Sequence, residues 1–181
     1  MTSPRPTTRA KLIVAARIVR PVPDVEIAWH TGERAPLRGL FALAEDSPQR
    51  LDAAIGRGRV LVAIDGDRVV GHLQLVDADA PDEAELLTMA VVEDRQGEGI
   101  GRALVERAIE ECRASGTRTL LVATAAASVG NLRFYQRLGF RMLRVERDAF
   151  VPADGYREGL TIEGIPLRDR VWLSLSLSAD P

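Results

Sequence analysis

The chain has 181 residues, of which 46% are hydrophobic and 28% are charged, and its formal net charge is −2. This length favours one domain with extensions, and the small negative charge offers no basic surface for nucleic acid. No apolar run reaches the length of about 18 residues that predicts a membrane span. The only cysteine, Cys112, has no partner for an internal disulfide. Charge, hydropathy and cysteine content together predict a cytoplasmic protein that binds neither nucleic acid nor membrane.

The first residues differ in composition from the rest. Residues 1–20 begin with Pro and Thr and then turn apolar, and Pro21 and Pro23 interrupt any regular element after them. We expect residues 1–20 to form a partly disordered extension. Residues 21–181 are expected to form a single domain.

Hydrophobic periodicity predicts strands and helices through the rest of the chain. Four helices are expected, over Gly32–Glu45, from Ser47-Pro48 to about Ile55, from the residues after Gly99 to about Ala114, and over Val129–Leu138. Seven strands are expected, over Val25–Trp29, Val60–Ile64, Arg68–Val76, Leu86–Val92, Thr119–Ala123, Phe140–Val145 and Val171–Leu177. A helix that joins two buried strands predicts a crossover between parallel strands.

A glycine-rich turn, Gln96–Gly101, separates the apolar run from the amphipathic helix that follows. The free N–H groups and the positive dipole end of a helix meet at such a turn, which favours a phosphate. A P-loop is excluded because Arg102 and Ala103 follow Gly101, where Lys and Ser or Thr are needed. The dinucleotide fingerprint also fails, because its last glycine falls on Arg102 or Leu104.

A third interpretation fits the turn. Gln96-x-x-Gly99-x-Gly101 resembles the acyl-coenzyme-A motif of the GNAT superfamily of N-acetyltransferases, Gln/Arg-x-x-Gly-x-Gly/Ala. About 30 residues later, the segment from Asn131 through Tyr135 to Gly139-Phe140 resembles the second landmark of that superfamily. The resemblance implies the GNAT fold, an α/β (α+β type) fold with a mixed, largely antiparallel sheet of about seven strands flanked by about four helices. It also implies acetyl-CoA as co-substrate and no metal.

The resemblance assigns the coenzyme to two groups of residues. Backbone amides of the turn would hold the pyrophosphate, and backbone groups of the preceding strand would pair with the pantetheine arm and polarise the thioester carbonyl. Arginine side chains beside the turn would add charge to the phosphates. The predicted coenzyme-binding residues are Met89, Ala90, Val91, Arg95, Gln96, Gly97, Glu98, Gly99, Ile100, Gly101, Arg102, Asn131 and Tyr135.

Two residues are predicted to be catalytic. Tyr135 matches the superfamily tyrosine that faces the coenzyme sulfur, and a phenol is a suitable proton donor to a thiolate. Glu85 falls where the histone-acetyltransferase branch keeps its catalytic glutamate, with a water chain as the alternative base. His72 could serve in a proton relay, with a purely structural role as the alternative.

The acceptor is predicted less closely. In the superfamily its pocket is formed by segments that correspond here to Leu37–Gly58 and Phe150–Asp169, where Asp154, Tyr156 and Glu158 could contact a cationic amine. The alternative for this loop is a surface hairpin or a homodimer contact. The predicted function is acetyl transfer from acetyl-CoA to a primary amine of a small molecule, by direct attack in a ternary complex. The alternatives are a protein or peptide N-acetyltransferase and an acyl-CoA-binding sensor without turnover.

Overall fold

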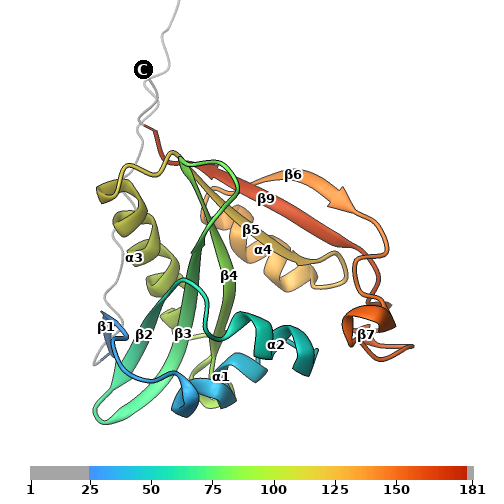
Figure 1. Cartoon of the computed structure of the whole chain (residues 1–181), viewed down its shortest axis with the longest axis horizontal. Coiled ribbons are helices and arrows are strands. Elements are labelled where there is room, and N and C mark those ends of the chain that lie inside the picture. Colours follow the sequence, from blue (N-terminus) through green and yellow to red (C-terminus); the bar gives the residue numbers. More distant parts are fainter. Residues whose placement is uncertain (1–24, 179–181) are drawn as a thin grey trace, which may run out of the picture.

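The computed structural model describes residues 25–178, so the predicted extension over residues 1–20 lies outside the described residues. Its main element is a seven-stranded sheet, whose strands are β1 (Val25–Trp29), β2 (Arg59–Asp65), β3 (Arg68–Asp77), β4 (Glu83–Val91), β5 (Thr119–Ala125), β6 (Arg141–Glu146) and β9 (Arg170–Ser176). Their order in the sheet is β1-β2-β3-β4-β5-β9-β6 (Figure 1). Every neighbouring pair is antiparallel except β4 and β5. The predicted mixed, largely antiparallel sheet is therefore confirmed.

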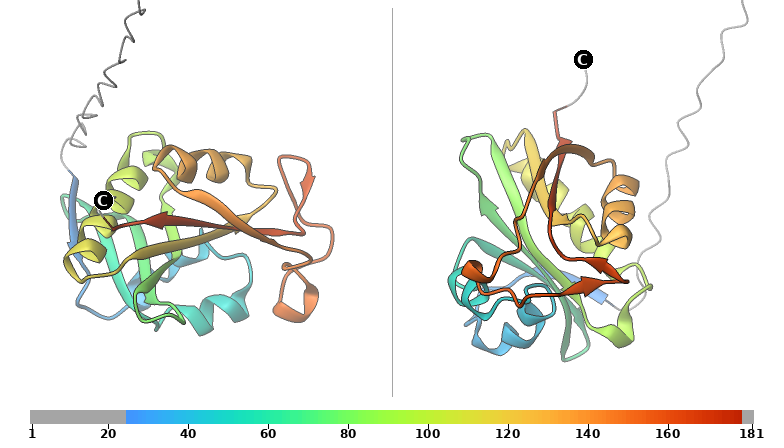
Figure 2. Two further views of the ribbon diagram at one scale, coloured as in Figure 1. Left: turned by 90° about the horizontal axis from the view of Figure 1, so that it is seen from above. Right: turned by 90° about the vertical axis from the view of Figure 1, so that its right-hand side faces the viewer.

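Four α-helices flank the sheet, namely α1 (Arg38–Ala42), α2 (Pro48–Ala54), α3 (Ile100–Ala114) and α4 (Val129–Arg137). Figure 2 shows α1 and α2 on one side of the sheet and α3 and α4 on the other. The core divides accordingly, because Phe41 and Leu51 pack against one face of β2 and Leu104 and Tyr135 belong to the cluster on the opposite face. Within residues 25–178 no helix has the length and apolar character needed to cross a bilayer.

The prediction of one helix over Gly32–Glu45 is wrong in extent. A 3₁₀ turn, η1 (Ala35–Leu37), comes first, and only five residues of α1 follow it. Pro36 explains the difference, because proline lacks a backbone N–H and disfavours helical geometry in the residue before it. The short α1 therefore owes its place to the burial of Phe41 in the core rather than to its own length.

The start of α2 connects two distant segments. Ser47 caps the helix as predicted, since its Oγ accepts a hydrogen bond from the Arg50 N–H at 3.3 Å. The same hydroxyl donates to the carbonyl of Asp154 at 2.7 Å. The segment that follows β6 is therefore tied to α2. It contains a 3₁₀ turn, η3 (Pro152–Asp154), and a small hairpin, β7 (Thr161–Ile162) with β8 (Ile165–Pro166). A surface hairpin is one of the two alternatives that the sequence offers for this loop.

The strands β4 and β5 separate partway along their length. Their parallel register runs only from Glu83 opposite Thr119 to Leu86 opposite Val122, although both strands continue beyond these residues. The register between β3 and β4 also shifts at this level, because Leu75 lies opposite Leu86 whereas Gln74 lies opposite Thr88. Leu87 is thus the extra residue of a β-bulge at the point where the two parallel strands diverge.

Gly58, between α2 and β2, allows a test of this packing. Its φ is +53°, and a Cβ there would lie 1.9 Å from the Leu75 carbonyl oxygen. We expect Gly58→Ala to lower the free energy of unfolding by about 3 kcal/mol or more, because a left-handed conformation and a backbone clash combine. Gly66 is the matched control: its φ is +56° with no atom within 4 Å of a Cβ, so Gly66→Ala should cost about 1 kcal/mol. Urea denaturation measures both, and equal losses would contradict the expectation.

Candidate active site

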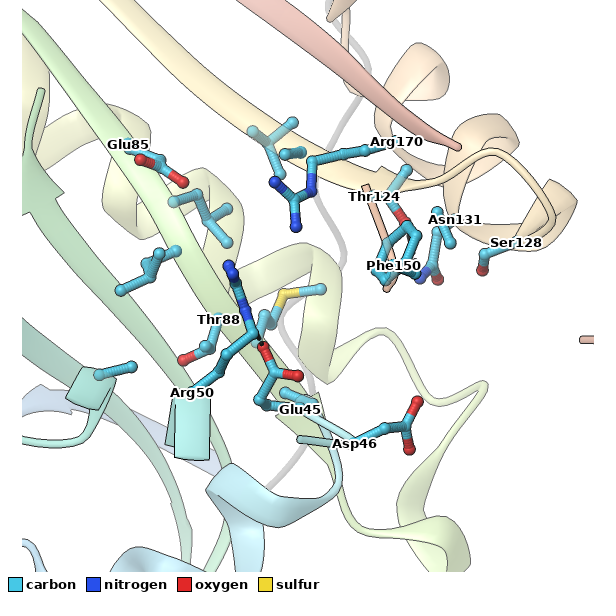
Figure 3. Close-up of a pocket in the computed structure, with 18 of the residues that line it drawn as sticks. Glu45, Asp46, Arg50, Glu85, Thr88, Thr124, Ser128, Asn131, Phe150 and Arg170 are labelled. Atoms are coloured by element: carbon cyan, nitrogen blue, oxygen red, sulfur yellow. Dashed lines mark hydrogen bonds and ion pairs between the residues drawn. The ribbon is translucent and has the colours of Figure 1, made fainter. Parts of the chain in front are cut away.

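A pocket of about 600 Å³ lies at the opening between β4 and β5. Asn131 and Tyr135 line it from α4, on one face of the sheet, and Glu85 and Thr88 line it from β4. Figure 3 shows Asn131 and Ser128 at one end of this space and Glu85 at the other. The separated strands therefore form a passage between the α3–α4 side and the α1–α2 side of the sheet.

Backbone groups of β4 face this passage. The Val92 N–H donates to the Val70 carbonyl of β3 at 2.9 Å, and successive residues of a strand direct their backbone groups to opposite edges. Met89 and Val91 consequently direct their N–H and C=O groups away from β3, and the Val91 carbonyl accepts a hydrogen bond from Gln96 Nε2 at 3.0 Å. Ala90 lies opposite His72 of β3, so its backbone groups face that strand. An extended ligand arm can therefore pair with the backbone of Met89 and Val91 as an added strand would.

The glycine turn leads from β4 to α3. Gly97 and Gly99 have left-handed φ values of +81° and +97°, and Gly99 caps α3 without a side-chain hydrogen bond. A Cβ on Gly97 would meet no atom within 4 Å, so the space above the turn is open. The first N–H groups of α3 are directed there, and these features fit the phosphates of a coenzyme.

The charged side chains of the turn have carboxylate partners. Arg95 donates from Nε to Glu98 Oε2 at 2.8 Å and also pairs with Asp65. Arg102 Nη2 lies 2.6 Å from Glu106 Oε1. Because ion pairs at the protein surface contribute little to stability, both arginines can exchange a carboxylate for a phosphate at small cost. Their contact with the coenzyme stays a prediction.

Tyr135 is held in one orientation by its neighbours. Its ring packs edge-to-face against Phe134 and Phe140, with ring centroids 5.1 and 5.6 Å apart. The side chain is 6% exposed, and this burial raises the pKa of the Tyr135 phenol above its ordinary value. One helical turn earlier, Asn131 Nδ2 donates to Thr124 Oγ1 of β5 at 3.3 Å. Tyr135 therefore presents a protonated hydroxyl beside the opening.

Glu85 lies on β4 at the other end of the pocket. Burial raises the pKa of its carboxyl, and the positive charges of Arg57, Arg170 and Arg50 oppose this shift only in part. Among residues 25–178, no cation lies within 4.0 Å of the Glu85 carboxylate to form an ion pair. Glu85 is thus a half-buried carboxylate that is available to accept a proton.

A buried polar network supports the bulge from the α2 side. Gln74 Nε2 donates to the carbonyls of Ala54 and Arg57 at 2.7 and 2.8 Å, which orients its amide. The Thr88 hydroxyl then donates to Gln74 Oε1 at 3.1 Å. His72 Nε2, 3.1 Å from Thr88 Oγ1, must be the donor in that pair. The network therefore assigns the neutral His72 tautomer with its proton on Nε2.

His72 is completely buried, stacked on Phe41 with ring centroids 4.2 Å apart. Its Nδ1 has no hydrogen-bond partner among the described residues. Burial lowers the pKa of the His72 imidazole to about 4, so the ring is neutral at pH 7. These contacts favour the structural role over the proton relay, because His72 reaches the pocket only through Thr88.

The pocket wall also contains Arg170 and Trp172, which the sequence did not indicate, and Arg50, which lies within the predicted acceptor segment Leu37–Gly58. Arg170 and Trp172 lie opposite Ala125 and Ala123 of β5, on the same face of the sheet as Glu85. The alternation along Val171–Leu177 is the only sequence signal for Trp172, whereas Arg170 precedes that segment. Of the three predicted acceptor contacts, Tyr156 lines the pocket, whereas Asp154 and Glu158 do not.

An opening between two parallel strands, a glycine turn at its margin that fits phosphates and a buried tyrosine beside it are the features of an acyl-coenzyme-A-dependent transferase. The chain belongs to the GNAT acetyltransferase family, because the model described as "Acetyltransferase (GNAT) family" matches residues 27–140. It is accordingly an N-acetyltransferase that uses acetyl-CoA. The predicted family, fold and co-substrate are confirmed.

Individual relatives agree with this assignment. The uncharacterised N-acetyltransferase YvbK of Bacillus subtilis is 33% identical over 153 residues, which cover 84% of this chain and 96% of YvbK. A Bacillus subtilis acetyltransferase solved in complex with CoA has a TM-score of 0.77 at 32% identity, covering 85% of this chain and 99% of its own. The [ribosomal protein bS18]-alanine N-acetyltransferase of Escherichia coli is 36% identical over 86 residues, which cover 48% of this chain and 57% of that enzyme.

The buried imidazole predicts how stability depends on pH. Since the pKa of His72 is about 4 in the folded chain and about 6.5 when unfolded, only the unfolded chain binds this proton between those values. The contribution of neutral His72 to the free energy of unfolding is therefore complete above pH 6.5. It is lost as the pH falls to 4, and the loss reaches about 3 kcal/mol. Urea unfolding at pH 7 and 4.5 should show a smaller loss for His72→Gln than for the wild type. His30→Gln, at the other histidine, is the control, and equal losses in all three proteins would contradict the expectation.

Proposed function

We propose that the protein transfers an acetyl group from acetyl-CoA to the primary amine of a small molecule, by direct attack in a ternary complex in the cytoplasm. The observation that carries the proposal is the single pocket that Tyr135 and Asn131 line from one side and Glu85 from the other. Donor and acceptor can meet there without a covalent enzyme intermediate. The buried, unpaired Cys112 gives no sign of an oxidising compartment and agrees with a cytoplasmic site.

On the coenzyme side, the residues of the turn and of β4 bind and orient the donor. The N–H groups of residues 96–102 hold the pyrophosphate, with Arg95 and Arg102 at its margin, and those of Met89 and Val91 pair with the pantetheine arm. Asn131 orients this arm from α4. When bound, acetyl-CoA supplies an activated thioester. The left-handed turn, the start of α3 without a side-chain cap and the separated strands support this assignment.

Two side chains move protons in this proposal. Glu85 accepts a proton from the acceptor amine, and the raised pKa of its carboxyl brings its basicity closer to neutral pH than that of an ordinary glutamate. Tyr135 gives a proton to the sulfur that leaves the acetyl group, and the raised pKa of its phenol keeps the hydroxyl protonated until then. Retention of this tyrosine beside the pocket also speaks against a sensor without turnover.

The walls of the acceptor side favour a small molecule. Arg50 and Ala54 of α2 line one side of the pocket, and the segment after β6 lines another side with Phe150, Tyr156 and Leu167. A protein N-terminus is the second candidate, because a relative in Escherichia coli acts on the alanine of ribosomal protein bS18. Mass spectrometry of peptides incubated with acetyl-CoA distinguishes the two, since peptide acetylation without turnover of free amines would favour the second.

The role of Glu85 predicts a specific loss of activity. In Glu85→Gln, kcat for amine acetylation should fall by about 10²-fold or more, because an amide cannot accept the proton. The activity that remains should increase with pH as the free amine becomes more abundant in solution. A thiol-release assay across pH 6–9 measures both effects. Glu83→Gln, two residues earlier on the same strand and outside the pocket, is the matched control, and similar kcat values in the two variants would remove Glu85 as the base.

The role of Tyr135 is tested by removal of one hydroxyl. Tyr135→Phe should lower kcat by about 10²-fold with little change in CoA affinity, because the ring and its contacts with Phe134 and Phe140 remain. Thiol release gives kcat, and calorimetry gives the CoA dissociation constant. In Tyr156→Phe, the same change at the other tyrosine should affect the KM of the acceptor more than kcat. Unchanged kcat in Tyr135→Phe would eliminate its role as the acid.

A further inference from the structure

The part of the pocket away from Asn131 and Tyr135, where the acceptor is proposed to bind, is lined by charges of both signs. Among the described residues that line the pocket, three are arginines and three are carboxylates, namely Arg50, Arg57, Arg170, Glu45, Asp46 and Glu85. The charges are equal in number, and only one pair among them is in contact: Arg50 pairs with Glu45, whereas Glu85 forms no ion pair with these arginines. An occupant that matches such a wall carries both signs of charge.

Arg50 and Arg170 are each held at one edge by a carboxylate. Arg50 Nε donates to Glu45 Oε2 at 3.3 Å, and Arg170 Nη1 donates to Glu146 Oε2 at 3.3 Å. Arg170 also stacks on the Phe150 ring, with its guanidinium carbon 5.2 Å from the ring centroid. These contacts orient both guanidinium groups, and that of Arg170 more firmly because it has two contacts. Within residues 25–178, the Nη atoms of Arg50 and the Nε and Nη2 atoms of Arg170 have no hydrogen-bond acceptor.

The two guanidinium groups enter the same part of the pocket. Figure 3 shows Arg50 reaching in from α2 and Arg170 reaching in from β9, with Glu85 farther along β4. Both arginines act on the pKa of Glu85 and on the pKa of Tyr156, which agrees with a position between these two residues. Two like charges that face one space repel each other, and an anion between them relieves this repulsion.

We propose that the space between Arg50 and Arg170 binds a carboxylate of the acceptor, so that the acceptor is an amino acid or a closely similar amino carboxylate. The proposal rests on the proposed acetyl transfer and specifies its substrate class. Two guanidinium forks match the planar carboxylate in geometry as well as in charge. The amine of the same molecule then lies toward Glu85 and the opening between β4 and β5. A zwitterion also suits a wall with equal numbers of positive and negative side chains.

A panel of L-α-amino acids, each paired with its carboxamide, tests this assignment. The carboxamide keeps the amine and the shape but removes the negative charge. For the preferred side chain, the wild-type enzyme should show a kcat/KM at least tenfold higher for the acid than for the amide. In Arg50→Gln and in Arg170→Gln this ratio should fall at least tenfold. Since each ratio compares the same two acceptors, differences in amine basicity cancel between variants.

Arg107→Gln is the matched control, because Arg107 pairs with Glu111 on the outer side of α3, away from this pocket. Its acid-to-amide ratio should equal that of the wild type. An unchanged ratio in both pocket variants, or no acid preferred over its amide by the wild type, would overturn the proposal while leaving acetyl transfer to amines intact.

Calorimetry separates this inference from the proposed function. The same acids and amides are titrated into the enzyme saturated with CoA. Tighter binding of an acid than of its amide, with a difference that disappears in Arg50→Gln and Arg170→Gln, supports the carboxylate subsite even if thiol release is absent. Selective binding of the acid without thiol release would overturn the proposed acetyl transfer but not the carboxylate subsite. Equal binding of acid and amide by the wild type would overturn the subsite.

Discussion

The early end of pairing between β4 and β5 is the constraint on which the rest of the structure depends. Their hydrogen-bonded register stops at Leu86 and Val122 while both strands continue. Backbone groups that lose a strand partner must be satisfied by water or by a ligand. The opening therefore creates a row of donors and acceptors in the middle of the sheet, and the elements that follow each strand extend this site. The glycine turn and α3 follow β4, whereas α4 with Tyr135 follows β5.

Each of the two strands stays paired along its outer edge in the region where they separate. β4 pairs with β3 as far as Val91, across the register shift at Leu87, and β5 pairs with β9 from Thr119 to Ala125. The bulge at Leu87 reorients β4 at the point of divergence, and the Gln74–Thr88–His72 network connects this point to the carbonyls that end α2. The acceptor wall and the coenzyme opening are thus parts of one hydrogen-bonded frame, which explains why a histidine is buried there without a charge.

Local signals in the sequence identified the elements and the coenzyme end of the site, whereas contacts between distant segments formed the acceptor end. Glycines with left-handed φ, the Ser47 cap and the alternation of apolar residues are each encoded within a few residues, so the turn, α2 and seven strands could be predicted. Arg170 could not be assigned, because its role depends on the β5–β9 register and on its contact with Glu146 of the neighbouring strand β6. The helix over Gly32–Glu45 was overestimated because its apolar pattern outweighed Pro36.

The electrostatics of Glu85 connect the acceptor to the chemistry proposed here. Burial raises the pKa of this carboxyl, and the positive field of Arg57, Arg170 and Arg50 limits the increase. A carboxylate bound between Arg50 and Arg170 would neutralise much of the field of these two arginines, because the opposite charges would be in contact. The pKa of Glu85 would then rise further, so that its carboxylate would be a stronger base while the acceptor is bound. In this proposal the negative charge of the acceptor has two effects, since it anchors the molecule and increases the basicity of the group that deprotonates its amine.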